Sequence, residues 1–294
     1  MIKYLAVHLY TMGWFLQEWG RDLQDEIVMQ DYRGFLEQRK QKRFSTCIFS
    51  DLERLNANGL KRLANVWRQL EDHGVRLLNH PEKALMRLPL LNRLYEAGIN
   101  DFNAYPVVAG RSPRPVRFPV FLRDASDHEG PKTDLIHGQE ELEACIRQLG
   151  ADGKLGASPI VTEFTSVMDD DGQYLKYGAF RIGDSIVPAH INAGQHWMVK
   201  ASNSGLDVKT VDRETDYVRS NPHETALMNI FRLASIDYGR IDYGVRDGRI
   251  QVFEINTNPT VMWPGNPVQP ERLARKQYVA DRLVAAFRRL DAPG

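Results

Sequence analysis

The sequence has few cysteines, no excess charge of either sign and no long apolar run. Cys47 and Cys145 lie far apart and fit no CxxC or Cys/His pattern, which argues against a zinc site or disulfide framework and favours the cytoplasm. Lysine plus arginine and aspartate plus glutamate both total 38, so no basic excess indicates nucleic acid or an anionic membrane as a partner. The apolar segment 1–16 is interrupted by Tyr4, His8, Tyr10 and Gly13 and is too short to span a bilayer, so we expect it to be folded structure or a segment that faces a partner.

Common active-site motifs are also absent. The chain contains no GxSxG elbow, no P-loop GxxxxGK[ST], no GxGxxG and no HExxH, which argues against the usual hydrolase, nucleotide and zinc-protease signatures. With 294 residues, 43% hydrophobic and 26% charged, the composition is that of a globular protein with one large domain or two to three subdomains.

The segment 240–259, RIDYGVRDGRIQVFEINTNP, alternates apolar and polar residues over two predicted strands. Its apolar back consists of Ile241, Tyr243, Val245, Phe253 and Ile255, and its polar front of Arg240, Asp242, Glu254 and Asn256. A three-residue loop, 247–249, sets Asp242 opposite Glu254, whereas a two-residue loop would set Asp242 opposite Phe253 and mix the faces. We therefore predict the three-residue loop.

Three oxygen-bearing side chains then converge on one face: Asp242, Glu254 and Asn256. Mg²⁺ prefers oxygen ligands and is commonly held by one or two carboxylates together with nucleotide phosphates, and Mn²⁺ is the other candidate. The alternative is a solvated polar face on an antiparallel sheet.

The rest of the chain indicates a mixed α/β organisation. We predict a strand at 45–52, helices over 59–75 and 80–99, a helix-like segment over 21–43, and a hairpin over 174–194 that turns at Gly183-Asp184. Pro89 predicts a break in the second helix. Closely spaced prolines from Pro106 onward suggest a subdomain boundary near residue 105.

Several cationic and aromatic residues are candidates for a phosphate or base site. Arg123 ends the apolar strand FPVFLRD and could bind phosphate in bidentate fashion, or it could reach solvent as an edge arginine. In the following loop, His128 and Lys132 could bind phosphate. Glu163 and Phe164 follow the strand SPIVTEF, where a flat base could bind or the sheet could simply end.

Lys176 and Arg181 lie five positions apart, hence on opposite faces of one predicted strand. On the front face, Arg181 could neutralise a transferring phosphoryl group. The alternative is an ion pair with a neighbouring acid.

Taken in order, PVFLR, TEF, KYGAFRIG, IDYG and FEINTNP resemble the ATP-grasp superfamily, in particular ligases of the ribosomal-protein glutamate ligase and D-alanine:D-alanine ligase types. The resemblance implies an α/β (α+β) fold in which two lobes grip ATP behind an N-terminal α/β domain. The domains would be residues 1–104, a small lobe 105–168, and a C-terminal lobe 169–294 that carries the magnesium hairpin.

The resemblance also implies roles for individual residues. Asp242, Glu254 and Asn256 match magnesium ligands, Glu163 and Phe164 the hinge that meets adenine, and Asp170, within 169–171, a ribose contact. The phosphate-binding set would be Lys83, Arg123, Lys132 and Lys176, with Arg123 and Arg181 as the catalytic cations. Two features depart from the family pattern, because Arg123 replaces a lysine and DASDHEGPK replaces a glycine-rich flap.

The implied activity is that of an ATP- and Mg²⁺-dependent ligase, which activates a carboxylate as an acyl phosphate for attack by an amine on an amino-acid or peptide type substrate. The alternatives are a kinase acting on a small molecule, or a nucleotide- or partner-binding module without turnover. Candidate substrate contacts are Arg114, Arg117, His190, His196, Trp197 and Lys200.

Overall fold

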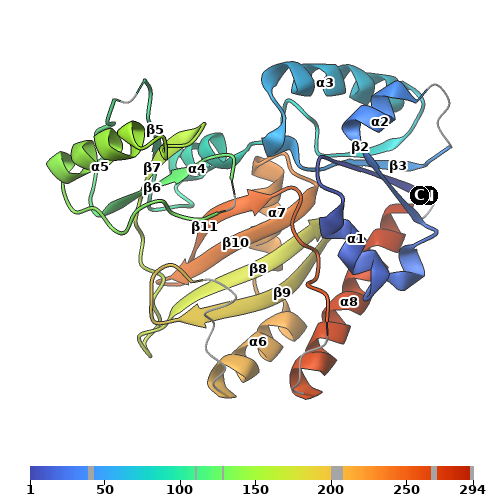
Figure 1. Cartoon of the computed structure of the whole chain (residues 1–294). Helices are drawn as coiled ribbons and strands as arrows, with labels where there is room; N and C mark the ends of the chain where they lie inside the picture. Colours follow the sequence, from blue (N-terminus) through green and yellow to red (C-terminus); the bar gives the residue numbers. More distant parts are fainter. Residues whose placement is uncertain (39–42, 110, 128, 200–207, 266–269, 292–294) are drawn as a thin grey trace.

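The computed structural model describes residues 1–38, 43–109, 111–127, 129–199, 208–265 and 270–291. In this part of the chain the strands form three sheets, whose orders are β2-β1-β3-β4, β5-β7-β6 and β11-β10-β8-β9. Figure 1 shows the four-stranded antiparallel sheet in the centre, with the other two sheets above it on opposite sides. The three sheets fall in the N-terminal, middle and C-terminal parts of the chain.

The first sheet is parallel and consists of β1 (Ile2–Ala6), β2 (Ile27–Asp31), β3 (Thr46–Phe49) and β4 (Arg76–Leu78). Between its strands lie α1 (Tyr10–Gln17), α2 (Tyr32–Glu37) and α3 (Ala57–Asp72), with the 3₁₀ turns η1 (Arg21–Leu23) and η2 (Leu52–Arg54). The prediction of a helical segment over 21–43 is wrong at residues 27–31. These residues form the strand β2, because they pair with the buried strand β1. Residues 1–16 fold into β1 and α1, as predicted.

The middle sheet consists of β5 (Ala104–Pro106), β6 (Val120–Asp124) and β7 (Pro159–Glu163), and α5 (Gln139–Ala151) packs on it. Its core is small and separate, with Val120, Leu122 and Val161 against Leu142 and Ile146. The helix α4 (Arg87–Glu96) precedes it. The predicted helix over 80–99 does not break at Pro89; instead α4 begins at Arg87, so that Pro89 lies in its first turn. The N–H groups of a first turn have no intrahelical acceptor, so a proline there removes no hydrogen bond.

The central sheet consists of β8 (Tyr174–Ile182), β9 (Ser185–Gly194), β10 (Tyr238–Arg246) and β11 (Arg249–Asn256). Its remaining partners are α6 (Val208–Ser220), α7 (Glu224–Leu233) and α8 (Pro270–Asp291). One hydrophobic core contains Tyr4 of β1, Phe231 of α7, Tyr238 of β10 and Phe287 of α8, all buried. The first and central sheets are therefore joined by continuous apolar packing.

The hairpin β10–β11 places Asp242 opposite Glu254, as predicted, but through a different turn. The loop is the two-residue Asp247-Gly248, with φ of 50° and 73°, and not the three-residue loop expected from the sequence. A β-bulge restores the register, because Asp242 pairs with Glu254 and Tyr243 with Val252, which leaves Phe253 as the extra residue. Phe253 consequently packs near Phe102 in a separate small cluster.

No helix among the described residues is long and apolar enough to cross a membrane.

Candidate active site

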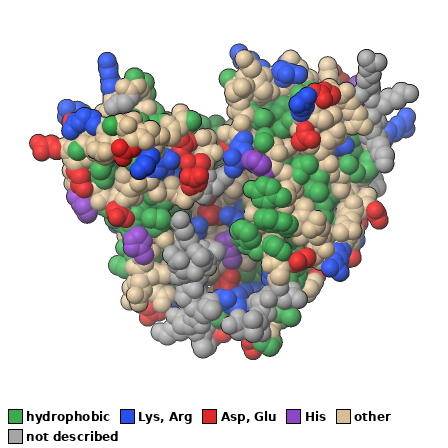
Figure 2. Space-filling view, viewed as in Figure 1, with side chains coloured by type: hydrophobic (Ala, Val, Ile, Leu, Met, Phe, Trp, Pro, Cys, Tyr) green, Lys and Arg blue, Asp and Glu red, His purple; other side chains and the backbone are tan. Residues whose placement is uncertain are grey.

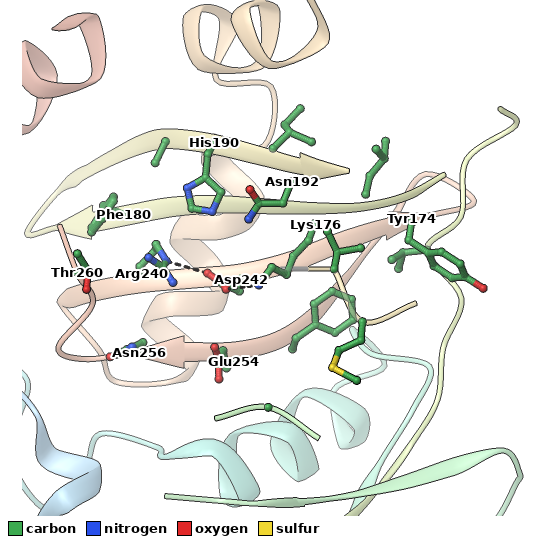
Figure 3. A pocket seen from close by; sticks show the side chains of 18 of the residues that line it. Tyr174, Lys176, Phe180, His190, Asn192, Arg240, Asp242, Glu254, Asn256 and Thr260 are labelled. Carbon is green, nitrogen blue, oxygen red and sulfur yellow. Dashed lines mark hydrogen bonds and ion pairs between the residues drawn. The ribbon is translucent and has the colours of Figure 1, made fainter. Parts of the chain in front are cut away.

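A cleft of about 850 Å³ lies where the three sheets meet, and Figure 2 shows the molecule hollowed between its upper parts. Its lining comes from the ends of β1 and β3, from β6 and β7, and from one face of the central sheet. Figure 3 shows that Lys176, His190, Asn192, Arg240, Asp242 and Glu254 all project from this face. The alternation of the strands thus builds a polar floor in the cleft.

Asp242 is at the centre of this floor and is only 3% exposed. Its Oδ2 accepts from Lys176 Nζ at 3.0 Å, and its Oδ1 accepts from Arg240 Nε at 2.8 Å. Burial alone would raise the pKa of Asp242, but Arg240 and Lys176 outweigh it and hold the pKa far below its usual range. Arg240 and Lys176 therefore favour the ionised form of Asp242.

Glu254, opposite Asp242, is held by two arginines from other elements. Its Oε2 accepts from Arg87 of α4, and Arg123 of β6 lies 3.4 Å from the same oxygen. Burial and the neighbouring Arg87 lower the pKa of Arg123. The Nε atoms of both arginines are buried and have no hydrogen-bond partner among the described residues. Of the two, Arg123 lines the cleft, where its guanidinium is suited to a further anion.

The floor has more positive than negative charge. Four cations, Lys176, Arg240, Arg87 and Arg123, surround the two carboxylates Asp242 and Glu254. Such an excess favours an anionic ligand with several oxygens.

The residues also fit a hard metal ion bound together with that anion. Asp242 and Glu254 lie opposite each other at the cleft, and Asn256, two residues on, shares the face. Oδ1 of Asn256 accepts from the backbone N–H of Asn258 at 2.8 Å. Among the described residues no cluster of three or more His, Cys, Asp or Glu side chains could hold a metal. A metal ion here would therefore be held by two carboxylates, one amide and oxygens from the ligand or water.

Arg87 also anchors the segment that follows β6. Its Nη1 donates to the carbonyl oxygens of Asp124, Ala125 and Asp127 at 2.8, 3.2 and 2.7 Å. Residues 129–131 of the same segment line the cleft. One arginine therefore joins this loop to Glu254 on the central sheet.

The aromatic end of the cleft lies beside β7. The Phe164 ring is 5.8 Å from Trp197 and 6.5 Å from Tyr174, and Phe121 is 5.0 Å from Trp197. Phe164 and Trp197 both line the cleft. Together these rings offer an apolar surface against which a flat ligand group can pack.

Glu163 is buried and its carboxylate is already bonded. Its Oε1 accepts from Tyr105 Oη at 2.8 Å and from the backbone N–H of Val116 at 3.0 Å, and Oε2 from the N–H of Asn103 at 3.0 Å. The side chain therefore fixes the surrounding loop, and the backbone N–H of Glu163 is also used, because it donates to the Asn103 carbonyl at 3.0 Å.

The structure does not bring four of the expected residues into the cleft. Lys83 is exposed in the turn before α4, Asp170 is exposed in the turn before β8, and Lys132 lies 3.6 Å from Asp127. Arg181 is buried elsewhere, because the odd spacing from Lys176 turns it to the other face of β8. There it donates to the carbonyl of Ile236 at 2.7 Å and pairs with Asp237 at 3.0 Å, so the front-face role expected for it is wrong.

Only some of the residues predicted to contact the substrate line the cleft. His190 lines the cleft, where burial and the charge of Arg240 lower its pKa to about 3, so its imidazole is neutral. Trp197 lines the cleft too, whereas Arg117 pairs with Asp101 at 3.1 Å and Arg114 is exposed. His196 contacts the Trp197 ring, and His128 and Lys200 lie outside the described residues.

Sequence reasoning assigned no role to three groups that the fold brings to the cleft. Arg240 lies two residues before Asp242 on the same strand, so both side chains share one face. This spacing could have predicted the contact of Arg240 with Asp242. His8 and Asp51, at the ends of β1 and β3, come from an N-terminal region whose motifs gave no signal. Asp51 is 1% exposed and lies 3.4 Å from His8 Nδ1. Burial and the nearby Glu53 raise the pKa of Asp51.

Comparison with protein-family models and with curated protein sequences finds no match. Comparison with solved structures finds proteins of similar fold. The D-alanine–D-alanine ligase from Bacillus anthracis complexed with ATP superposes with a TM-score of 0.55 and 12% identity, covering 99% of this chain and 98% of that one. The ATP-grasp ligase PsnB complexed with a minimal precursor gives 0.54 and 12%, covering 97% and 98%. The D-cycloserine synthetase DcsG gives 0.50 and 18%, covering 98% and 100%. The likeness is one of fold and extends over the whole chain.

Proposed function

Since the chain has the ATP-grasp fold, we propose that it is an ATP- and Mg²⁺-dependent ligase that joins a carboxylate to an amine. The observation that carries the proposal is the pairing of Asp242 with Glu254 in the cleft, within the reach of four cationic side chains. A fold alone does not fix a reaction, but this arrangement of charges suits a metal-bound polyphosphate.

The nucleotide has a natural orientation in this cleft. Its base would lie beside the Phe164 and Trp197 rings, which line the cleft. Its phosphates would lie against Lys176 and Arg123, whose charges neutralise theirs. Asp242, Glu254 and Asn256 would hold Mg²⁺, or Mn²⁺, which supplies charge neutralisation and fixes the phosphate geometry.

The chemistry would proceed in two displacements. A carboxylate oxygen attacks the terminal phosphorus of ATP, the bond to the bridging oxygen breaks, and ADP leaves. An amine then attacks the carbon of the acyl phosphate, the amine proton is lost, and phosphate departs with one oxygen of the original carboxylate. Arg240, fixed at 2.8 Å from Asp242, is placed to stabilise the charge that develops on the transferred group.

The carboxylate and the amine would enter from the side of the N-terminal sheet. His8, Asp51 and Arg54 line that side of the cleft, opposite the aromatic end beside β7. Both PsnB, which is described in complex with a precursor peptide, and D-alanine–D-alanine ligase make amino-acid or peptide substrates a reasonable expectation.

The first test is nucleotide binding, measured as the melting-temperature shift with MgATP, MgADP and ATP plus EDTA. A ligand at a hundredfold excess over its dissociation constant stabilises the native state by about 2.7 kcal/mol. We expect a Mg²⁺-dependent shift in the wild type and none in Glu254→Gln. Asp184→Asn is the matched control, because Asp184 is exposed in the β8–β9 turn of the same sheet. Equal shifts in both variants would refute the site.

A second test distinguishes a ligase from a kinase. With a substrate carboxylate labelled with oxygen-18, a ligase releases phosphate that carries the label, because the acyl phosphate breaks at its carbon–oxygen bond. A kinase leaves the label on the organic product, and a binding module without turnover releases no ADP.

A further inference from the structure

An aromatic wall of Tyr10, Trp14 and Trp263 stands at the mouth of the cleft. The Tyr10 and Trp14 rings are 5.0 Å apart, and Trp14 and Trp263 are 5.5 Å apart. Tyr10 and Trp263 line the cleft, yet they are 51% and 62% exposed. Large apolar side chains gathered at a cavity and left open to solvent are typical of a ligand-binding surface.

The wall begins where the candidate metal strand ends. After Asn256, the chain is fixed to the N-terminal region, because Asn258 Nδ2 donates to the His8 carbonyl at 3.0 Å and Val261 N–H to the Thr11 carbonyl at 3.4 Å. Thr260, Val261 and Met262 continue the cleft lining as far as Trp263. A group seated on the wall is thus part of a molecule whose other end can reach the Asp242–Glu254 pair.

The charges around the wall select the kind of ligand. Among the described lining residues that come from 51–54, α6 and α8, the bases are Arg54, Arg272, Arg275 and Lys276 and the acids are Asp51 and Glu214. Glu18 lies near the wall as well, but its carboxylate accepts from the backbone N–H of Gly265 at 2.7 Å. Lys276 Nζ donates directly to the Trp263 carbonyl at 2.7 Å. Aromatic faces can bind cations, but these neighbours would repel one, so the wall suits an uncharged ring.

Arg275 adds a donor for an anionic group. Its side chain is 10% exposed and pairs with Glu214 at 2.5 Å through Nη2, while its Nη1 is buried and has no hydrogen-bond partner in the part of the chain that the structure describes. An arginine buried in this way is suited to a second acceptor, such as a carboxylate.

We propose that the aromatic wall is the specificity subsite for the carboxylate substrate, and that it selects a carboxylate beside an aromatic side chain over one beside a small side chain. The source is either an aromatic amino acid or the aromatic carboxyl-terminal residue of a peptide. The proposal rests on the proposed ligase function for its place in a reaction, but the selectivity is a property of binding and is measurable without turnover.

The test is calorimetric titration with N-acetylphenylalanine, N-acetylalanine and free phenylalanine, in the presence of a non-hydrolysable MgATP analogue. An aromatic contact contributes enough to give about tenfold tighter binding of the phenylalanine compound than of the alanine compound. Trp263→Ala should remove most of this preference, and Trp263→Phe should retain it. Free and acetylated phenylalanine distinguish an amino acid from a peptide end.

Tyr278→Ala is the matched control, because Tyr278 is an exposed aromatic of α8 that does not line the cleft. The control should keep the wild-type preference. Equal affinity of the wild type for the alanine and phenylalanine compounds, or an unchanged preference in Trp263→Ala, would overturn the subsite. If the wild type does not bind the nucleotide, the proposed function is contradicted. If it releases ADP but shows no preference for the aromatic compound, the proposed function stands and only the subsite is refuted.

Discussion

The substitution Asp242→Asn tests the site most directly, because it removes the charge of one side chain and nearly keeps the shape of that side chain. Asp242 is 3% exposed and bonds Lys176 and Arg240, whose side chains are 26% and 19% exposed. Removing one partner of a buried ion pair costs about 3–5 kcal/mol. Since both cations keep some contact with water, we expect the lower end, about 3 kcal/mol, or roughly 6 to 10 °C in melting temperature.

The pH dependence of this loss has a defined sign. The folded-state pKa of Asp242 is depressed, so its stabilisation is fully present above the unfolded pKa of about 3.9 and is lost as the pH falls below that value. The gap in melting temperature between wild type and Asp242→Asn should therefore be constant from about pH 8 to 5 and narrow only in stronger acid. A gap that disappears between pH 8 and 6 would refute the assignment of the effect to this carboxylate.

The same variant separates a structural carboxylate from a metal ligand. With Asp242 neutral, Lys176 and Arg240 still attract phosphates, so ATP in EDTA should stabilise the variant at least as much as the wild type. The extra stabilisation by Mg²⁺ should disappear. Thermal melts with ATP, with and without Mg²⁺, measure both, and a Mg²⁺ increment that survives in the variant would refute Asp242 as a ligand.

Three further variants test other contacts. Arg87→Met should weaken MgATP binding at least tenfold, measured by calorimetry, because it releases both Glu254 and the loop after β6; unchanged affinity would contradict this bridge. Gly178→Ala should lower the melting temperature, since a Cβ there would lie 2.4 Å from the His190 ring; an unchanged melt would show that the ring can move. Arg181→Met should lower the melting temperature but leave the MgATP affinity of the folded protein unchanged, because Arg181 bonds backbone carbonyls away from the cleft; a selective loss of affinity would restore its predicted role.

The sequence was informative where alternation and side-chain chemistry act locally. The period of two in the segment 240–256 is enough to put Asp242, Glu254 and Asn256 on one face, and the structure keeps that arrangement. The loop was predicted wrongly because a bulge at Phe253 can compensate a shorter turn, and no local pattern distinguishes the two solutions.

Long-range partners were harder to predict. Arg87 and Glu254 are 167 positions apart, and nothing in either segment specifies their contact. Lys83 was predicted to bind phosphate, but it is exposed in the turn before α4, and Arg87 in the first turn of that helix makes the contact with Glu254. His8 and Asp51 reach the cleft only because β1 and β3 are adjacent parallel strands that end at the same edge.

The three sheets are not packed against one another equally tightly. The first and central sheets share one hydrophobic core, so the Asp242–Glu254 pair and the aromatic wall belong to one packed unit. The middle sheet has its own core and meets the central sheet through a small cluster around Phe102 and the arginine contacts to Glu254. Ion pairs of this kind are weaker constraints than continuous apolar packing. In the proposed orientation, the nucleotide phosphates would lie where the packed unit faces its least tightly packed neighbour. Arg123, which joins the two lobes through Glu254 and lines the cleft, would then also contact the phosphates.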